Sequence, residues 1–199
     1  MLMAARLGGA ILASVVASLT RTTAAALVNR TIDDQRGDSV TGQLPSKSPA
    51  NKWAFGQLCP GCGIRPGSVV DPKKVFQGTW SDSTYHPGQP DHVINASFTG
   101  TAVYVYNLIV NTVPEVTTAT NLSFTVDGTY MAQYIHFPNA TSPLVLYDVC
   151  VFSHTELTNQ THLLELRSRL ASSKSRRHKP YLLRCPHLSP PMGHVKPLA

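Results

Sequence analysis

Hydrophobic and polar residues alternate in several short segments between residues 92 and 166, and these segments are rich in β-branched and aromatic side chains. The clearest alternation covers residues 121–126, in which Leu122, Phe124 and Val126 are hydrophobic and the residues between them are polar. Successive side chains of a strand point to opposite faces of a sheet, so this pattern predicts a strand that is buried on one side. Residues 92–98 alternate in the same way and predict a second such strand.

Residues 101–110 and 143–152 are hydrophobic at most positions, which indicates strands that are buried on both faces. Asp127 and Gly128 predict a hairpin turn between the strand at 121–126 and a further strand at 130–137. A short last strand is expected at 162–166, with His162 as a packed or hydrogen-bonded strand residue. No amphipathic helix follows residue 26. The pattern therefore predicts an all-β protein, and we expect an antiparallel β-sandwich.

The first 26 residues have the features of a secretory signal peptide. Arg6 precedes an apolar run of 13 residues, and small residues ending at Ala26 fit a cleavage site. The alternative is an uncleaved anchor, but this run is shorter than the roughly 18 apolar residues that a membrane span needs. We therefore expect a secreted, extracellular protein with no membrane span in its mature chain.

The basic charge of the chain is concentrated at its C-terminal end. Residues 27–166 contain seven basic and eleven acidic side chains, which gives a net charge of −4. Residues 167–199 contain eight basic side chains and no acidic one, which gives +8. A basic nucleic-acid-binding protein carries its charge on the folded domain, so we expect no nucleic-acid partner. The sequence predicts three parts: a signal peptide (1–26), a β-sandwich domain (27–166) and a basic, proline-rich, disordered tail (167–199).

Five Asn-x-Ser/Thr sequons are compatible with a secreted protein. Each is a candidate N-glycosylation site if the chain passes through a eukaryotic secretory pathway. Chance occurrence in a chain rich in Asn and Thr is the alternative explanation. Two of the asparagines fall on the polar faces of predicted strands, where an attached glycan would project into solvent. The five asparagines are Asn29, Asn95, Asn121, Asn139 and Asn159.

Cys59 and Cys62 have the C-x-x-C spacing of redox sites and of half a zinc site. The redox interpretation requires a helix N-terminus and the zinc interpretation a second ligand pair, and the sequence indicates neither. A local disulfide in an oxidising compartment is therefore favoured. We expect Cys150 to be a buried free thiol. A pairing of Cys150 with Cys185 is an alternative.

Trp80, Asp82, Tyr85 and His86 form the candidate binding site. Aromatic faces stack on sugar rings, and carboxylates accept hydrogen bonds from sugar hydroxyls. The alternative is that Trp80 belongs to the core, as buried tryptophans commonly do. No catalytic or cofactor-binding motif occurs, so we expect neither enzymatic activity nor a cofactor.

Two groups of charged residues could be metal sites, but polar loops are the favoured interpretation of both. His86, Asp91 and His92 are close in sequence and could hold a metal ion, but a polar loop with solvent-exposed histidines is favoured. Asp33 and Asp34 lie near Asp38, and solvated turn residues are favoured there over a Ca²⁺ site because the spacing differs from that of an EF-hand. We expect no metal site.

Several segments together resemble a β-sandwich module of secreted and surface proteins in mushroom-forming fungi. They are GTWSDSTYHPG (78–88), FTGTAVYVYNL (98–108), NLSFTVDG (121–128) and LYDVCVFSHTELTNQTHLLEL (146–166). The module is similar to galactose-binding-domain-like jelly rolls, which mostly bind carbohydrate or serve as accessory domains. The resemblance implies a galactose-binding-like jelly roll over roughly residues 28–166 and implies no catalytic residue.

The chain departs from this family after residue 166. Family members continue with a further apolar strand, whereas this chain continues with a basic segment that contains five prolines. An altered reading frame or translated intron, or a genuine disordered tail, would explain the segment. We expect a non-catalytic module that binds carbohydrate or a cell-wall or surface component. The alternative is a structural or interaction ectodomain without a small ligand, released by loss of a C-terminal membrane anchor.

Overall fold

The protein is built almost entirely of β-strands. The computed structural model describes residues 28–168 and 195–196, and the expected signal peptide lies outside this range. Helical structure in these residues is limited to four 3-10 turns of three residues each, η1 (Ala50–Lys52), η2 (Gly56–Leu58), η3 (Pro72–Lys74) and η4 (Phe76–Gly78). In this part of the chain, no helix is long and apolar enough to cross a membrane. The predicted all-β class is confirmed.

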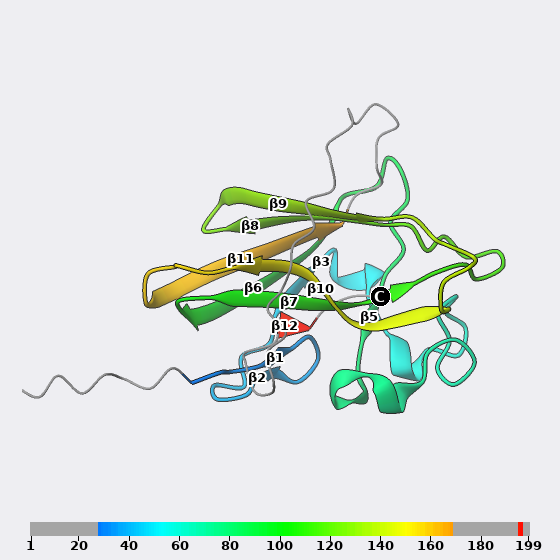
Figure 1. Ribbon diagram of the computed structural model, residues 1–199, viewed down its shortest axis with the longest axis horizontal. Coiled ribbons are helices and arrows are strands. Elements are labelled where there is room, and N and C mark those ends of the chain that lie inside the picture. The colour runs from blue at the N-terminus through cyan, green and yellow to red at the C-terminus, as the bar shows by residue number, and fades with distance from the viewer. Residues whose placement is uncertain (1–27, 169–194, 197–199) are drawn as a thin grey trace, which may run out of the picture.

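The first sheet contains five antiparallel strands in the order β3-β6-β11-β8-β9 (Figure 1). The hairpin between β8 and β9 is predicted correctly: Asp127 and Gly128 both have positive φ, of 51° and 77°. This combination suits the tight turns that join antiparallel strands. The strands are β3 (Ser46–Ser48), β6 (His92–Gly100), β8 (Thr120–Val126), β9 (Thr129–His136) and β11 (Gln160–Ser168).

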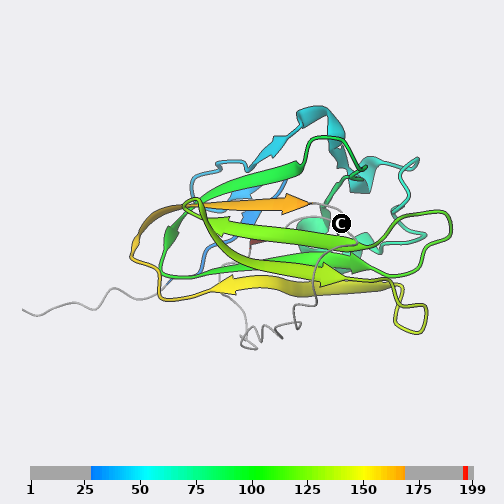
Figure 2. The ribbon, with the colours of Figure 1, turned by 90° about the horizontal axis from the view of Figure 1, so that it is seen from above.

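The second sheet has the order β10-β7-β12-β1-β2, and its longest strands run along the longest axis of the molecule (Figure 2). The long pair β10–β7 is antiparallel, as is β1–β2, whereas β12 pairs in parallel with both β7 and β1. The strands are β1 (Ile32–Asp33), β2 (Gly37–Asp38), β7 (Val103–Val110), β10 (Val145–His154) and β12 (Val195–Lys196).

The structure corrects the expected start and content of the C-terminal tail. Arg167 and Ser168 belong to β11, where they pair with β6 and β8, so the first sheet extends two residues past the expected boundary at 166. The two residues of β12 come from the segment expected to be wholly disordered, and they lie between β7 and β1. The rest of that segment lies outside the described residues.

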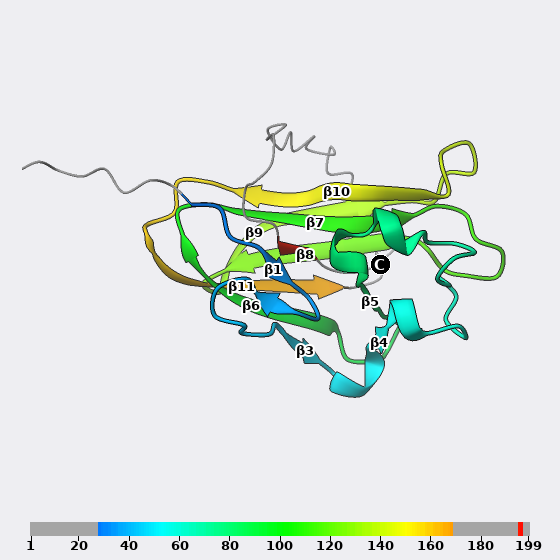
Figure 3. The same ribbon diagram turned by 90° about the horizontal axis from the view of Figure 1, so that it is seen from below.

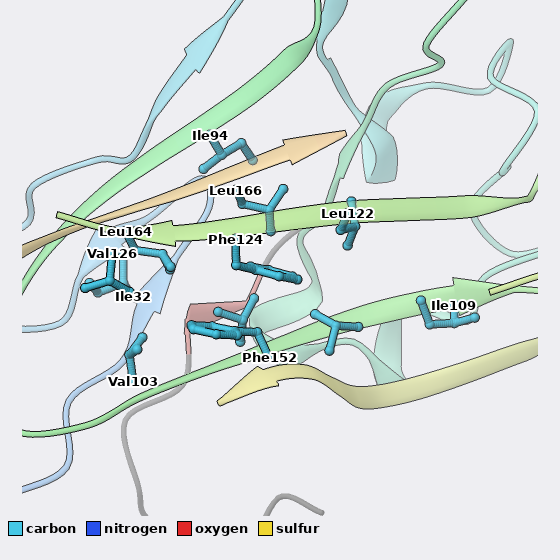
Figure 4. Packing of buried hydrophobic residues seen from close by; sticks show 12 residues of the cluster. Ile32, Ile94, Val103, Ile109, Leu122, Phe124, Val126, Phe152, Leu164 and Leu166 are labelled. Atoms are coloured by element: carbon cyan, nitrogen blue, oxygen red, sulfur yellow. The ribbon is translucent and has the colours of Figure 1, made fainter. Parts of the chain in front are cut away.

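Hydrophobic side chains of the two sheets pack against each other in one core (Figure 4). The predicted inward face of β8 is confirmed, because Leu122, Phe124 and Val126 are all buried. The Phe124 ring stacks on Phe152 of β10, with ring centroids 4.7 Å apart and planes inclined by 7°. Burial of two aromatic rings at this contact contributes strongly to holding the two sheets together.

His162 fixes the turn of β8–β9 to β11. This side chain is 3% exposed, its Nδ1 lies 2.7 Å from Asp127 Oδ2, and its Nε2 lies 2.8 Å from the carbonyl oxygen of Thr158. Both ring nitrogens therefore face acceptors, which favours the doubly protonated imidazolium. The hydrogen bond to Asp127, followed by the one to Thr158, raises the pKa of His162. The expectation of a packed, hydrogen-bonded strand residue is confirmed.

The 3-10 turns and the short pair of β4 (Ala54–Phe55) and β5 (Ser81–Asp82) gather at one end of the molecule (Figure 3). A second hydrophobic cluster lies under these turns and includes Trp80, Ile64, Val70 and Leu108. Trp80 packs directly over Gly56, whose N–H donates a hydrogen bond of 2.8 Å to the Trp80 carbonyl oxygen. This cluster holds the turns in place beside the ends of β7, β8 and β11.

Candidate functional site

A cavity of about 90 Å³ lies where β7 ends, β8 begins and β11 ends. Asn107, Leu108 and Val110 of β7 contribute to its lining, together with Ser168 at the end of β11. Asp82 of β5, loop residues 63–64, 83–84 and 116–119, Trp53 and the start of β8 complete the lining. One water molecule needs about 10–15 Å³ in such a cavity, so this volume holds several waters or a small group of hydroxyls.

Asp82 places a buried carboxyl group on this cavity. It lies on β5 opposite Ala54 of β4, and the residue is 8% exposed. Burial raises the pKa of Asp82 to about 6, although the Ser83 backbone N–H donates a hydrogen bond to the carboxylate. The described lining contains no lysine, arginine or histidine, and no salt bridge to Asp82 occurs in the described residues. The ionised form of Asp82 therefore lowers the free energy of unfolding of the protein.

Two further polar groups at the cavity have no hydrogen-bond partner among the described residues. Asn107 is 4% exposed, and its Oδ1 is buried and unpartnered. Trp53 is half-buried, and its Nε1 is also buried and unpartnered. A buried polar group without a partner costs about 1–3 kcal/mol, and such groups are rare in native proteins. An acceptor and a donor on one small cavity therefore indicate a place where a polar ligand or ordered water completes the hydrogen bonding.

A set of aromatic rings supports the loop that carries Asp82. Ser83 Oγ and His92 Nδ1 are hydrogen-bonded. The His92 ring packs between Trp53 and Tyr85, with centroid distances of 5.8 Å to each. Burial, then the positive charges of Lys52 and His86, lower the pKa of His92, which keeps its imidazole neutral at neutral pH. These contacts fix residues 82–84 against the start of β6.

The four residues of the predicted binding site are in different environments. Asp82 lines the cavity, whereas Tyr85 does not line it and is half-buried with its ring against His92. His86 is exposed in a turn and does not line the cavity. The prediction of Trp80 as a binding residue is wrong, because Trp80 is 1% exposed within the second hydrophobic cluster and cannot offer its face to a sugar ring.

Sequence reasoning missed Asn107 and Trp53. A signal for Asn107 was present, since it is the one amide in an otherwise hydrophobic and aromatic strand, VYVYNLIV. An amide in a strand that is buried at both faces requires a partner. Trp53 had no comparable signal, because it lies in a turn-rich segment without periodicity.

Asp33 and Asp34 form a buried structural network and not the solvated turn that the sequence predicts. Asp38 is the turn residue that was expected, because it is half-buried and accepts hydrogen bonds from the Val40 and Thr41 N–H groups. Asp33 and Asp34 are both buried. Asp33 accepts hydrogen bonds from the Arg36 N–H and from Thr79 Oγ1, at 2.8 and 3.0 Å. Lys47 Nζ lies 3.4 Å from Asp34 Oδ2, yet burial raises the pKa of Asp34. The network joins β1 to β3 and to the segment before β5.

Residues considered for a metal site are engaged in other contacts. Asp91 Oδ2 lies 3.1 Å from Arg167 Nη1, and His92 is held by Ser83. No group of three or more His, Cys, Asp or Glu side chains suited to a metal ion occurs within residues 28–168 and 195–196.

The five sequons lie at the surface or on the outward side of the first sheet. Asn29, Asn139 and Asn159 are exposed. Asn95 of β6 and Asn121 of β8 are half-buried, and they alternate with the buried residues of their strands. Both asparagines alternate with core residues as predicted, but Asn95 Oδ1 is itself buried. Glycosylation of the two asparagines stays a prediction.

The structure confirms the predicted disulfide between Cys59 and Cys62 but not the predicted free thiol at Cys150. Cys59 and Cys62 form a disulfide with a Cα–Cα distance of 5.4 Å. The expectation of a buried free thiol at Cys150 is wrong: Cys150 is half-buried and disulfide-bonded. Register shifts of β10 on both sides of Cys150 explain why it does not share the burial of Phe152. The alternative pairing involves Cys185, which lies outside the described residues.

Comparison with known proteins adds no family assignment to this geometry. No protein-family model matches the chain, and no curated protein matches it either.

Proposed function

We propose that this protein is a secreted, N-glycosylated, non-catalytic β-sandwich module of the galactose-binding-like jelly-roll type that binds carbohydrate. The observation that carries the proposal is the cavity with Asp82, Asn107 and Trp53. It combines a carboxylate, an unpartnered amide oxygen and an unpartnered indole N–H in one small volume. A sugar presents adjacent hydroxyls, which donate and accept hydrogen bonds and would satisfy all three groups.

The two sides of the cavity match the two surfaces of a sugar ring. Ile64, Leu108, Val110 and Leu122 provide apolar surface, which suits the C–H face of a ring. Thr118 and Thr120 provide polar lining beside Asp82 and Asn107. Binding sites for small molecules are commonly apolar with a few precisely placed polar groups. The volume of about 90 Å³ suits the hydroxylated edge of one sugar residue and not an enclosed oligosaccharide.

The lining supports binding over glycoside hydrolysis. Hydrolysis uses two carboxyl groups about 5–9.5 Å apart. Asp82 is the one acidic side chain in the described lining of the cavity. His92 does not line the cavity, is almost fully buried and is hydrogen-bonded to Ser83.

A glycan array with the full-length secreted protein tests the proposal. The array should carry glycans ending in galactose, glucose, mannose and N-acetylglucosamine, together with wall polysaccharides. The Asn107→Leu variant should lose the binding, because it removes the amide oxygen from the cavity. Its stability should not fall, since a buried, unpartnered amide is replaced by a hydrocarbon side chain of similar size.

The exposed Gln43 offers a matched control, because Gln43→Leu makes the same kind of change outside the cavity. Circular dichroism and thermal unfolding establish that both variants fold. If no glycan binds, or if Asn107→Leu binds as the parent does, the proposal fails. In that case, the alternative of a structural or interaction ectodomain without a small ligand takes its place.

A further inference from the structure

The cavity carries a negative charge that no described side chain of the protein offsets. Asp82 is the one ionisable side chain of the described lining. Lys47 does not line the cavity, and its ammonium group is engaged by Asp34 and by the hydroxyl of Ser81. His92 stands behind Ser83 and is neutral at neutral pH because burial lowers its pKa. A ligand that brings a positive charge would therefore meet an uncompensated carboxylate.

Two groups of the cavity lining have free capacity to accept hydrogen bonds. The ionised Asp82 carboxylate only accepts hydrogen bonds, and Asn107 Oδ1 is buried with no donor among the described residues. An ammonium group offers three N–H donors and no acceptor, which complements such a pair. Trp53 adds an indole to the lining, and an indole face attracts a cation.

We propose that the cavity selects a sugar with a free amino group, whose ammonium binds Asp82 and Asn107 Oδ1 while its neighbouring hydroxyls bind the remaining polar groups. This inference rests on the carbohydrate-binding function proposed above and specifies its ligand class. A neutral sugar can fill the same space, but it leaves the carboxylate without a counter-charge. An ammonium group adds an opposite charge to the hydrogen bond with Asp82, which makes the bond shorter and stronger than a bond between neutral partners.

Isothermal titration with paired monosaccharides tests the selection. Glucosamine is compared with glucose, galactosamine with galactose, and N-acetylglucosamine with glucosamine, all at pH 7 with the full-length protein. The amino sugar should bind about tenfold more tightly than its neutral counterpart, which corresponds to about 1.4 kcal/mol. Acetylation removes the positive charge, so N-acetylglucosamine should lose this advantage.

Two variants test whether Asp82 is responsible for the preference for amino sugars. Asp82→Asn should bind amino and neutral sugars equally, because it retains the shape and removes the charge. Asp91→Asn removes a carboxylate that lies outside the described cavity lining and should keep the preference. Equal affinity of the parent for both sugars of each pair, or a preference that survives Asp82→Asn, overturns the inference but leaves carbohydrate binding intact. Absence of binding to every sugar on the array overturns the proposed function itself.

Discussion

Replacement of Asp82 by asparagine should stabilise the protein at neutral pH. The pKa of this carboxyl group is raised from 3.8 to about 6 because the group is buried without a positive partner. The folded state therefore binds a proton more tightly than the unfolded state. Between pH 3.8 and about 6, this difference lowers the stability of the parent as the pH rises.

The size of the effect follows from the displacement of the pKa. A displacement of one pH unit corresponds to about 1.4 kcal/mol, so the displacement of Asp82 predicts a loss of up to about 3 kcal/mol at pH 7. Asparagine has nearly the same shape and can still accept the Ser83 N–H, but it carries no charge. Asp82→Asn should therefore gain up to about 3 kcal/mol over the parent at pH 7 and almost nothing at pH 3.5.

Urea unfolding of the parent and of Asp82→Asn at pH 3.5, 5 and 7 measures this difference. Asp91→Asn is the control, because it removes a carboxylate that forms an ion pair with Arg167. That change should leave the stability unchanged or lower it by up to about 1 kcal/mol at pH 7. An Asp82→Asn variant no more stable than the parent at pH 7 would refute the reasoning. A gain of the same size at pH 3.5 would refute it too.

Three further predictions concern the framework around the site. Gly56→Ala should destabilise the protein by about 1–3 kcal/mol, because a methyl group there would lie 1.9 Å from Trp80 Nε1; an unchanged thermal midpoint would contradict this. Phe124→Ala should cost about 3–5 kcal/mol in urea unfolding, since it removes the ring stacked on Phe152, and a loss below about 1 kcal/mol would contradict the core packing. His162→Asn should lower the free energy of unfolding most below pH 6.5. The pKa of His162 is raised in the folded state, so the protonated side chain stabilises the fold fully below that pH, and this stabilisation is lost as the pH rises through the folded-state pKa. Equal losses in urea unfolding at pH 5.5 and 8.5 would contradict this last assignment.

The long strands were predictable from sequence because their periodicity reflects one local rule. The alternation of residues 121–126 indicates which side chains face the core, and the Asp127-Gly128 dipeptide indicates where the chain turns. The short strands β1, β2, β4 and β5 have two residues each. Two residues cannot show a period, so these strands depend on contacts with distant parts of the chain.

The candidate site was only partly predictable for the same reason. The sequence predicts Asp82 at the site, but it also predicts Trp80 there, which belongs to the core. The burial of Trp80 depends on Gly56, which lies 24 positions earlier and forms the surface on which the indole packs. Asp33 is likewise buried because Thr79, far along the chain, supplies its hydroxyl. Composition cannot show such pairings, because the residue types alone are equally compatible with exposed turns.

The β1–β2 hairpin is attached to the molecule in two independent ways. Its main chain continues the second sheet through the two residues of β12, whereas its side chains bind elsewhere, with Asp33 on Thr79 and Gln35 on the Trp80 carbonyl oxygen. An isolated two-stranded hairpin is at best marginally stable in water. Fraying of β12 alone would leave the side-chain attachment in place, so the hairpin can detach only when both connections open in the same event. The two attachments together protect the β1–β2 hairpin, which contacts the residues just before β5, from local unfolding.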